Sequence, residues 1–327
     1  MVESDTNLGL SIIVCCHNSA KRLPETLTHL SHQDITEDWE VIVIDNASSD
    51  NTSEIAETFA DRLPLRVVPE PLPGLSHARH RGFTESSFGV LGFIDDDNHV
   101  QADWARLLLN NFKERREIGA CGGPIVEKCE VKPPEWFENF KGNYTIWAPL
   151  DTAGYMNSPL CGAGLGIRKQ AIEQLLAKGF KSMLSDRKGA NLSSGGDFEL
   201  GYALLLTGWK LYYDPALMLE HFIPKERLVW DYLCRLNYGF GMQSVILDIY
   251  KALAGNSPMP NWSNEVSRTR LARWRQLPSH IITSLGGKEG SPGEILWQSQ
   301  SGRLWALLQC KHDYSGMVET VRGLRKN

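Results

Sequence analysis

The sequence lacks the features of a membrane-spanning or secreted protein. It contains no apolar run of about 18 residues, the length at which a transmembrane helix is predicted. The segment 1–9 is polar and acidic and has no apolar core of the kind found in signal peptides. The seven cysteines show no C-x-x-C spacing, which argues against a zinc site and a disulfide framework. We therefore expect a cytoplasmic protein.

The sequence also lacks an excess of positive charge. Lys and Arg number 34 against 39 Asp and Glu, for a formal net charge of −5, which argues against a dedicated nucleic-acid binder. No G-x-G-x-x-G follows any predicted strand, which argues against a dehydrogenase. Hydrophobic residues make up 42% of the 327 residues and charged residues 22%, so the chain can bury a substantial core, and its length suits about two domains.

Apolar runs alternate with helical patterns in the first half of the chain. Short β-branched runs at 10–16, 40–44 and 90–94 predict strands that are buried on both faces. A helix is expected after Asn51, which has Glu54 three residues on, as in a capping box. Strands alternating with helices predict an α/β fold with a parallel, doubly wound sheet. Residues 209–213 predict a further strand, no strand is expected after that, and the pattern beyond Pro224 is helical.

Polar side chains follow each of the first three predicted strands. These are His17 and Asn18, then Asp45 and Asn46, then the triplet Asp95, Asp96 and Asp97. In open α/β sheets ligands bind outside the carboxyl ends of the strands, so we expect these groups at one edge of the sheet. The alternative is that turns simply favour Asp and Asn.

The acidic triplet predicts a divalent metal site. If the extended conformation persists, Asp95 and Asp97 point to one side and Asp96 to the other. Carboxylates held together repel, and burying them is costly unless a cation offsets their charge. Mn²⁺ or Mg²⁺ is the expected counter-ion, because such ions bind a few carboxylates and leave positions open for substrate phosphates.

Four further residues each have a functional and a structural interpretation. Asp45 either contacts a base or ribose or forms the turn before the next helix, and Arg79 either binds phosphate or a base edge or lies on a solvated face. Asp197, in the segment Ser193-Ser-Gly-Gly-Asp-Phe-Glu-Leu200, is expected in the first turn of a helix running toward Leu206. It is either catalytic or a complement to the helix dipole. His221 is an isolated histidine, and most such residues are structural.

Taken in order, these segments resemble the family 2 glycosyltransferases, which have the glycosyltransferase-A fold. The resemblance covers roughly residues 10–230 and rests on these segments: Ser11-Ile-Ile-Val-Cys-Cys-His-Asn18, Val41-Ile-Val-Ile-Asp-Asn-Ala-Ser-Ser-Asp-Asn-Thr52, Gly74-Leu-Ser-His-Ala-Arg79, Phe93-Ile-Asp-Asp-Asp-Asn98, Gly162-Ala-Gly-Leu-Gly-Ile-Arg168, Gly195-Gly-Asp-Phe-Glu-Leu200 and His221-Phe-Ile-Pro-Lys-Glu-Arg227. It implies a mixed, mainly parallel sheet with helices on its faces. It also implies a nucleotide-sugar-binding half at 1–100 and an acceptor-binding, catalytic half at 101–224, followed here by a mainly helical region at 225–327.

The resemblance implies an inverting transfer of a sugar from a nucleoside diphosphate donor, with a UDP-sugar favoured, to a glycan or lipid-linked acceptor in bacterial glycan synthesis. Residue by residue, it places these groups at the nucleotide: His17, Asn18, Asp45, Arg79, Asp95 and Asp96. It assigns Mn²⁺ or Mg²⁺ to Asp95, Asp97 and His221. It makes Asp197 the general base, with Glu199 as the first alternative. The sequence departs from the family at His17, where Tyr is frequent, at His80, where Asn is usual, and at Gly196, where Glu is common.

The sequence leaves two alternative functions and one membrane contact to consider. A nucleotidyltransferase would need a loop rich in Gly, Arg and Lys after the first strand, and residues 17–20 do not provide one. A non-catalytic nucleotide-sugar-binding protein would tolerate the loss of Asp197. The stretch 268–275 holds four arginines around Leu271 and Trp274, which suits anionic lipid headgroups, and the alternative is a helix that packs on the catalytic domain.

Overall fold

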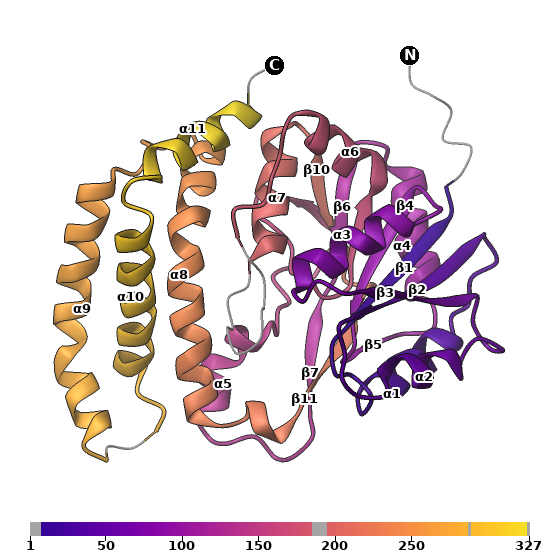
Figure 1. The fold of residues 1–327 in the computed structure, drawn as a ribbon, viewed down its shortest axis with the longest axis horizontal. Coiled ribbons are helices and arrows are strands. Elements are labelled where there is room, and N and C mark those ends of the chain that lie inside the picture. The colour runs from indigo at the N-terminus through magenta and orange to yellow at the C-terminus, as the bar shows by residue number, and fades with distance from the viewer. Residues whose placement is uncertain (1–7, 185–194, 287–288, 326–327) are drawn as a thin grey trace. The chain divides into compact units, whose positions relative to one another are not determined.

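The computed structural model describes residues 8–184, 195–286 and 289–325 (Figure 1). The chain divides into two compact units. The sheet unit comprises Met1–Lys128, Thr145–Gly179 and Gly208–Phe222, and the helical unit comprises Cys129–Tyr144, Phe180–Thr207 and Ile223–Asn327. Segments from the middle of the chain thus contribute to both units. The functional division at residues 100 and 224 stays a prediction.

The predicted parallel strands are confirmed. In the sheet unit β1 (Leu10–Cys16) pairs in parallel with β2 (Trp39–Asn46) on one side and with β4 (Val90–Asp95) on the other. The register sets Cys16 opposite Asp45 and Cys15 opposite Asp95. The carboxyl ends of the three strands therefore meet at one edge of the sheet, which we call the carboxyl edge and define by residues 16–18, 45–46 and 95–97.

The remaining strands complete a mixed eight-stranded sheet. They are β3 (Leu65–Glu70), β6 (Ile118–Gly122), β8 (Gly154–Met156), β9 (Leu165–Arg168) and β10 (Lys210–Tyr213), and the order is β3-β2-β1-β4-β9-β6-β10-β8. β9 is antiparallel to both β4 and β6, so the sheet changes direction beside β4. The predicted mixed α/β fold is therefore confirmed.

A second, three-stranded sheet has the order β5-β11-β7 and was not expected. Its strands are β5 (Asn98–Val100), β7 (Ile125–Cys129) and β11 (Leu219–Ile223). The prediction of no strand after Tyr213 is wrong, because β11 lies beyond it. Its inward positions are Leu219, His221 and Ile223, and the polar His221 in the middle interrupts the apolar alternation that would mark a strand.

Helices pack on the sheet and bury its strands. α3 (Leu75–Glu85) contacts β1 and β2, and α4 (Trp104–Glu114) contacts β4 and β6. The others in this unit are α1 (Leu23–Ser31), α2 (Thr52–Glu57) and α6 (Lys169–Ala177). α3 lies close to the sheet at Gly82, where a Cβ atom would come within 2.4 Å of the Ile13 side chain. This close contact sets the distance between β1 and α3, the helix that carries Arg79.

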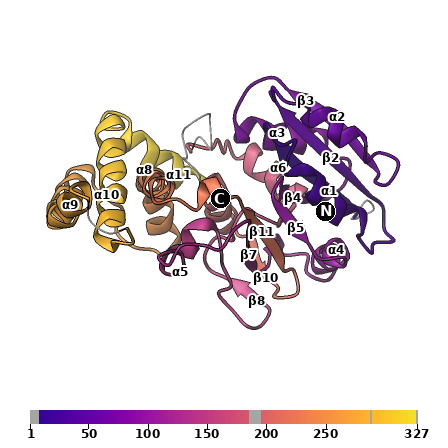
Figure 2. The same ribbon diagram turned by 90° about the horizontal axis from the view of Figure 1, so that it is seen from below.

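The helical unit confirms the predicted helical C-terminal region. It contains α5 (Phe137–Phe140), η1 (Lys141–Tyr144), α7 (Gly196–Leu206), η2 (Lys225–Arg227), α8 (Trp230–Ala254), α9 (Trp262–Ser284), α10 (Pro292–Gln309) and α11 (Tyr314–Leu324). α9 packs on α10, which packs on α8, as Figures 1 and 2 show. A Cβ on Gly302 would lie 1.9 Å from the Tyr238 carbonyl oxygen, and one on Gly241 would lie 1.9 Å from that of Ser299. α8 and α10 therefore meet backbone to backbone.

Within the described residues, no helix has both the length and the apolar character that crossing a membrane requires.

Candidate active site

His17 and Asn18 join the ends of β1 and β2. The His17 Nδ1–H donates to the Asn46 carbonyl oxygen at 2.8 Å, and the Asn18 side-chain oxygen accepts from the Ser49 backbone N–H at 2.8 Å. Asn18 has a φ of 51°, in the left-handed region that Asn tolerates better than most residues. Both side chains remain exposed. Two predicted nucleotide-binding residues therefore lie at the carboxyl edge, on a loop held by side-chain hydrogen bonds.

Asp45 has the turn-forming role that one interpretation gave it. Its Oδ1 accepts from the Ser48 backbone N–H at 3.1 Å, and its Oδ2 accepts from the Ser53 hydroxyl in α2. The side chain is half-buried at the end of β2. Each carboxylate oxygen has a second lone pair. The turn contacts therefore leave the predicted base contact open.

Asn46 is a residue to which the sequence analysis gave no role. It is buried, donates to the carbonyl oxygens of Glu70 at 3.1 Å and Leu72 at 2.6 Å, and accepts from the Gly74 N–H at 2.7 Å. Gly74 precedes the first residue of α3. Asn46 therefore ties the end of β2 to the start of the helix that carries Arg79. Its position at a strand end beside Asp45 was visible in the sequence, but its three partners were not.

Arg79 lies near the end of β1. Burial raises the pKa of the Cys15 thiol to about 12, the charge of Arg79 lowers it, and the charge of Asp95 raises it. Arg79 and Asp95 are thus both close enough to Cys15 to act on it. Arg79 is half-buried, as suits a group that faces a ligand rather than bulk solvent. The structure therefore brings this predicted phosphate-binding residue to the carboxyl edge.

The acidic triplet forms a tight turn. β4 ends at Asp95, Asp96 and Asp97 form the turn, and β5 begins at Asn98. The condition that the extended conformation persists through the triplet is therefore not met. Asn98 holds the turn, because its side-chain oxygen accepts from the Asp95 N–H at 3.0 Å and its amide donates to Asp97 Oδ1 at 3.2 Å. The three carboxylates are separated by the turn instead of by strand alternation.

Asp96 is paired with Arg22, a residue that the sequence analysis missed. The Arg22 guanidinium lies 2.5 Å from Asp96 Oδ2. Burial raises the pKa of Asp96, the charge of Asp97 raises it further, and Arg22 opposes both effects. Arg22 is 74 residues away in sequence, immediately before α1, and no local pattern links it to the triplet. The Arg22 guanidinium thus compensates the charge of Asp96 within the triplet.

Asp97 and His221 come together, as the metal prediction required. His221 Nε2 lies 3.6 Å from Asp97 Oδ1, and both side chains are almost fully buried. The antiparallel pairing of β11 with β5 sets His221 opposite Asn98, and the Phe222 N–H donates to the Asp97 carbonyl oxygen at 2.8 Å. The Asp97 carboxylate and the His221 imidazole are ligand types that a divalent ion such as Mn²⁺ accepts. The assignment of Asp95 to the same ion stays a prediction.

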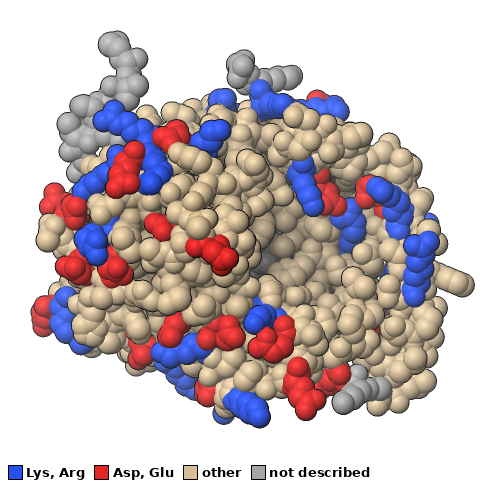
Figure 3. Space-filling model, turned by 180° about the vertical axis from the view of Figure 1, so that it is seen from behind, with Lys and Arg blue, Asp and Glu red and all other residues tan. Residues whose placement is uncertain are grey.

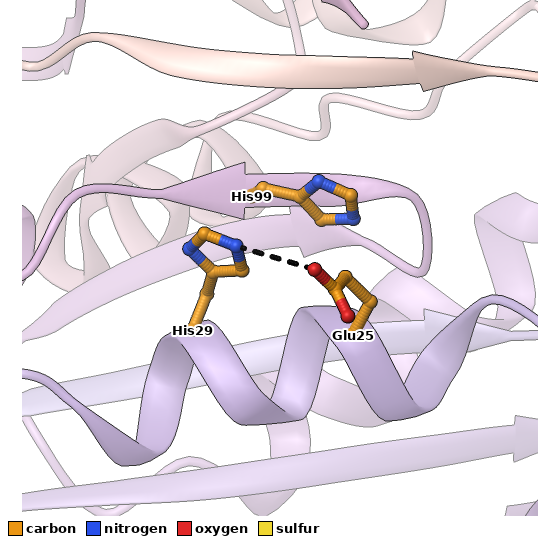
Figure 4. A group of neighbouring side chains, drawn as sticks. All are labelled: Glu25, His29 and His99. Carbon is orange, nitrogen blue, oxygen red and sulfur yellow. Dashed lines mark ion pairs between the residues drawn. The ribbon is translucent and has the colours of Figure 1, made fainter. Parts of the chain in front are cut away.

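A second group of candidate ligands contains Glu25, His29 and His99 (Figure 4). One ligand atom from each lies within 4.8 Å of the others, and the two imidazole rings stack with centroids 4.9 Å apart. The His29 Nδ1–H donates to the Val100 carbonyl oxygen at 3.0 Å, so Nε2 faces Glu25. The Lys128 ammonium already lies 3.3 Å from His99 Nδ1 and 3.9 Å from Glu25 Oε1. Lys128 therefore supplies the positive charge at this group.

Asp197 lies in the first turn of α7, as predicted, and α7 belongs to the helical unit. α7 begins at Gly196 after Gly195, whose φ of 105° is in the left-handed region that favours glycine. Ser193 and Ser194, which we expected in the turn, lie outside the described residues. Asp197 is half-buried at a helix N-terminus, where backbone N–H groups favour an ionised carboxylate.

Glu199, the alternative base, has a structural role. It is fully buried, and its carboxylate accepts from the Ser182 hydroxyl at 2.6 Å, the Met183 N–H at 3.0 Å, the Leu184 N–H at 3.1 Å and the Tyr250 hydroxyl at 3.1 Å. A carboxylate with four donors and no exposed surface has no room for an acceptor hydroxyl. These contacts argue against Glu199 as the base, and the role of Asp197 stays a prediction.

Comparison with known proteins decides the family. The model of "Glycosyl transferase family 2" matches residues 11–176, which span β1 through most of α6. The chain belongs to glycosyl transferase family 2. This confirms the predicted family, the predicted fold and the prediction of a glycosyltransferase enzyme.

Relatives and solved structures agree with this family. The chain is 26% identical to the succinoglycan biosynthesis protein ExoM of Rhizobium meliloti, over 72% of this chain and 73% of that protein. It is 26% identical to a poly-beta-1,6-N-acetyl-D-glucosamine synthase of Staphylococcus aureus, over 70% of this chain but 55% of the synthase. The fold resembles that of residues 1–349 of S. aureus TarS, solved in complex with UDP-GlcNAc. The TM-score is 0.52 at 16% identity, with 97% of this chain and 90% of the other covered.

Proposed function

We propose that this family 2 protein is a metal-dependent, inverting glycosyltransferase. It moves a sugar from a nucleoside diphosphate donor, with a UDP-sugar favoured, to a hydroxyl group of a glycan or lipid-linked acceptor. The observation that carries this proposal is the buried pair of Asp97 and His221, 3.6 Å apart, next to Asp95 at the carboxyl edge. Oxygen and imidazole ligands at the end of a strand suit an ion that holds a diphosphate.

Asp95, Asp97 and His221 would hold the ion, and Arg22 would hold Asp96 away from it. Arg22 is the only cation that contacts Asp96 among the ion pairs of the described residues. Mn²⁺ or Mg²⁺ bound by this set would offset the charge that develops on the departing diphosphate. Asp96 then has a positioning role at the nucleotide, because its charge is already compensated.

The loops after β1 and β2 are the proposed nucleotide site. His17 and Asn18 are exposed on a hydrogen-bonded loop, Asp45 has oxygen lone pairs for a base N–H, and Arg79 brings a positive charge near Asp95. The TarS fragment of similar fold was solved in complex with UDP and with UDP-GlcNAc, which supports a UDP-sugar as the donor here.

Asp197 is the proposed general base. Inversion by direct displacement requires a base that takes the proton of the attacking hydroxyl on the face opposite the leaving group. Asp197 is half-buried in a turn with two glycines, where a substrate hydroxyl can approach closely, and its neighbour Glu199 is fully engaged. Its Oδ atoms would accept the proton as the bond to the sugar forms.

The relatives support a role in bacterial glycan synthesis. One is named for succinoglycan biosynthesis and another for the synthesis of poly-beta-1,6-N-acetyl-D-glucosamine. We place the reaction in the cytoplasm, at the inner face of the membrane, where lipid-linked acceptors are exposed.

A screen of nucleotide sugars for Mn²⁺-dependent donor hydrolysis and transfer tests the function. Wild-type protein should hydrolyse one UDP-sugar slowly and stop when the metal is chelated. Asp97→Asn should lose this activity. Asp61→Asn is the control and should keep it, because Asp61 is an exposed carboxylate in the turn that follows α2. Metal-dependent binding without turnover of any sugar would favour the non-catalytic alternative. Release of pyrophosphate from a nucleoside triphosphate would favour a nucleotidyltransferase.

A further inference from the structure

One face of α9 is apolar and exposed. The opposite face packs on α10, where the Arg273 guanidinium lies 3.9 Å from the Trp297 ring centroid and its Nε donates to the Ser301 hydroxyl at 2.9 Å. On the outer face the exposed fraction is 75% for Trp274, 64% for Ile282 and 83% for Leu285, which follows the helix. These are large apolar groups that the fold of this chain leaves in water.

The exposed residues form one stripe. Leu271, Trp274, Pro278, Ile282 and Leu285 follow one another at intervals of three or four residues, so they share a side of the helix. A shallow hollow of about 420 Å³ lies along the stripe. Its lining is entirely apolar and consists of Trp274, Leu277, Pro278, Ile281 and Ile282. A contiguous exposed apolar patch of this kind marks an interaction site.

Arginines lie on both sides of the stripe. At 100° per residue Arg268 and Arg275 fall on one flank and Arg270 on the other. The acidic residue of α9 is Glu265, which is largely buried. Its Oε2 lies 2.8 Å from the Arg303 guanidinium, and its Oε1 lies 3.3 Å from that of Arg268. In Figure 3, α9 lies at the right-hand edge, where blue side chains stand on a largely tan surface. The outer face of α9 is therefore apolar and basic in a chain whose net charge is −5.

We propose that the outer face of α9 binds an anionic membrane surface. Trp274, Ile282 and Leu285 enter the boundary between headgroups and acyl chains, and the flanking arginines contact lipid phosphates. An interfacial helix has this arrangement, with a narrow apolar stripe, a Trp anchor and basic residues that extend outward from its flanks. The helix lies in the plane of the surface, in agreement with the lack of a spanning helix among the described residues.

Charge complementarity favours a membrane over a second copy of this chain. In a two-fold contact through α9 the stripe of one copy would face that of the other, and Arg270 and Arg275 would approach the same arginines of the partner. Glu265, the carboxylate of α9, is largely buried and already pairs with Arg303 and Arg268, so it is not available to Arg270 and Arg275. Like charges across an interface oppose association, whereas lipid phosphates attract them.

Vesicle flotation of the full-length protein tests this proposal without reference to turnover. Wild-type protein should float with vesicles that contain phosphatidylglycerol and remain in solution with phosphatidylcholine alone, and raised salt should release it. Arg270→Gln and Arg275→Gln should each lower the partition coefficient about fivefold, the equivalent of about 1 kcal/mol for an Arg near the surface. The double variant Trp274→Ser, Ile282→Ser should lower it at least about tenfold.

Leu72→Ser is the matched control, because Leu72 is an exposed apolar residue of the sheet unit, 59% accessible. It should float like the wild type. All these side chains are exposed, so circular dichroism should find each variant folded. Failure of the wild type to float at low salt would overturn the proposal, as would equal flotation of the Trp274→Ser, Ile282→Ser variant. A concentration-dependent dimer that this double variant abolishes, without flotation of the wild type, would assign the stripe to a second copy instead.

Discussion

Tyr250 in α8 donates its hydroxyl hydrogen to Glu199 Oε1 in α7 over 3.1 Å. The same carboxylate accepts from Ser182, Met183 and Leu184, so one buried group joins α7, α8 and the segment before residue 185. Asp197 stands two residues earlier in α7. Glu199 therefore has a structural role in α7, and the catalytic role that we propose falls to Asp197.

Glu199→Gln should destabilise the helical unit. The amide NH₂ of Gln would face at least one of the donors that now point at the carboxylate, and that donor would lose its acceptor. We expect a loss of about 1–3 kcal/mol in the free energy of unfolding, measured in urea. Tyr250→Phe removes a single hydrogen bond and should cost less, about 1 kcal/mol. Equal stability of Glu199→Gln and the wild type would contradict the structural role of Glu199.

The cost of Glu199→Gln should depend on pH. Burial raises the pKa of Glu199 above its ordinary value of 4.5, although its four donors oppose the shift. The folded state therefore holds this proton more tightly than the unfolded state, and the stability it contributes is lost as pH rises through the raised pKa. The difference in unfolding free energy between wild type and Glu199→Gln should be largest below pH 4.5 and shrink as pH rises through the raised pKa. A difference that grows with pH would mean that the carboxylate is stabilised as an anion.

Gly302→Ala should weaken the packing of α10 on α8. The added methyl group would meet the Tyr238 carbonyl oxygen at 1.9 Å, and because this neighbour is backbone, the helices must move apart. We expect a loss of about 1–3 kcal/mol by urea unfolding. Gly316→Ala in α11 is the control, since nothing lies within 4 Å of its added methyl group. The control should be neutral or stabilising by up to about 1 kcal/mol, because Ala favours helix over Gly.

Removal of the metal should weaken the binding of UDP. With Mn²⁺ present, calorimetry should detect UDP binding, and chelation should reduce the affinity at least about tenfold, because the diphosphate then faces Asp95 and Asp97 without a bridging cation. Asp97→Asn and His221→Gln should make UDP binding weak and insensitive to Mn²⁺. His99→Gln, in the network with Lys128, should keep the metal dependence. A reversal, with His99→Gln insensitive to metal and His221→Gln unaffected, would place the ion among Glu25, His29 and His99.

The sequence was informative where a local pattern determined the structure. Apolar runs that end in polar residues located β1, β2 and β4, and because parallel strands end at the same edge, Asp45 and Asp95 were expected to meet there. The turn at Asp96 and Asp97 was not predictable in this way. It depends on two hydrogen bonds of the Asn98 side chain, which strand and turn propensities do not describe.

Long-range partners account for what the sequence could not reveal. Arg22 meets Asp96 across 74 residues, and β11 is a strand because it pairs with β5 and β7, in spite of His221 in its middle. The structural role of Glu199 in the Gly195–Glu199 segment also depends on partners that are distant in sequence. Asp197 and Glu199 are both acidic residues at the start of α7, and the sequence does not reveal the four donors that surround Glu199.

Asp197→Asn should reduce turnover and leave donor binding intact. The substitution keeps the shape of the side chain and removes the negative charge of the carboxylate, which is the group that accepts the proton. A carboxylate at a helix N-terminus is a weak base, so its contribution should come from its position and from accepting the proton late, about 10²- to 10⁴-fold in rate. We therefore expect kcat to fall by that range while the affinity for UDP with Mn²⁺ stays within about twofold of wild type.

The stability of Asp197→Asn separates this effect from a structural one. Asp197 is half-buried, and Glu199 holds α7 through its own partners, so the free energy of unfolding should fall by no more than about 1 kcal/mol, the contribution of a negative charge at a helix N-terminus. Glu199→Gln should show the opposite pattern. Its stability should fall clearly, and its apparent kcat should fall only in proportion to the fraction of protein that is folded. If Asp197→Asn kept more than about a tenth of wild-type turnover, the proton would have to leave by another group. The full engagement of Glu199 means that this group would lie outside α7's first turn.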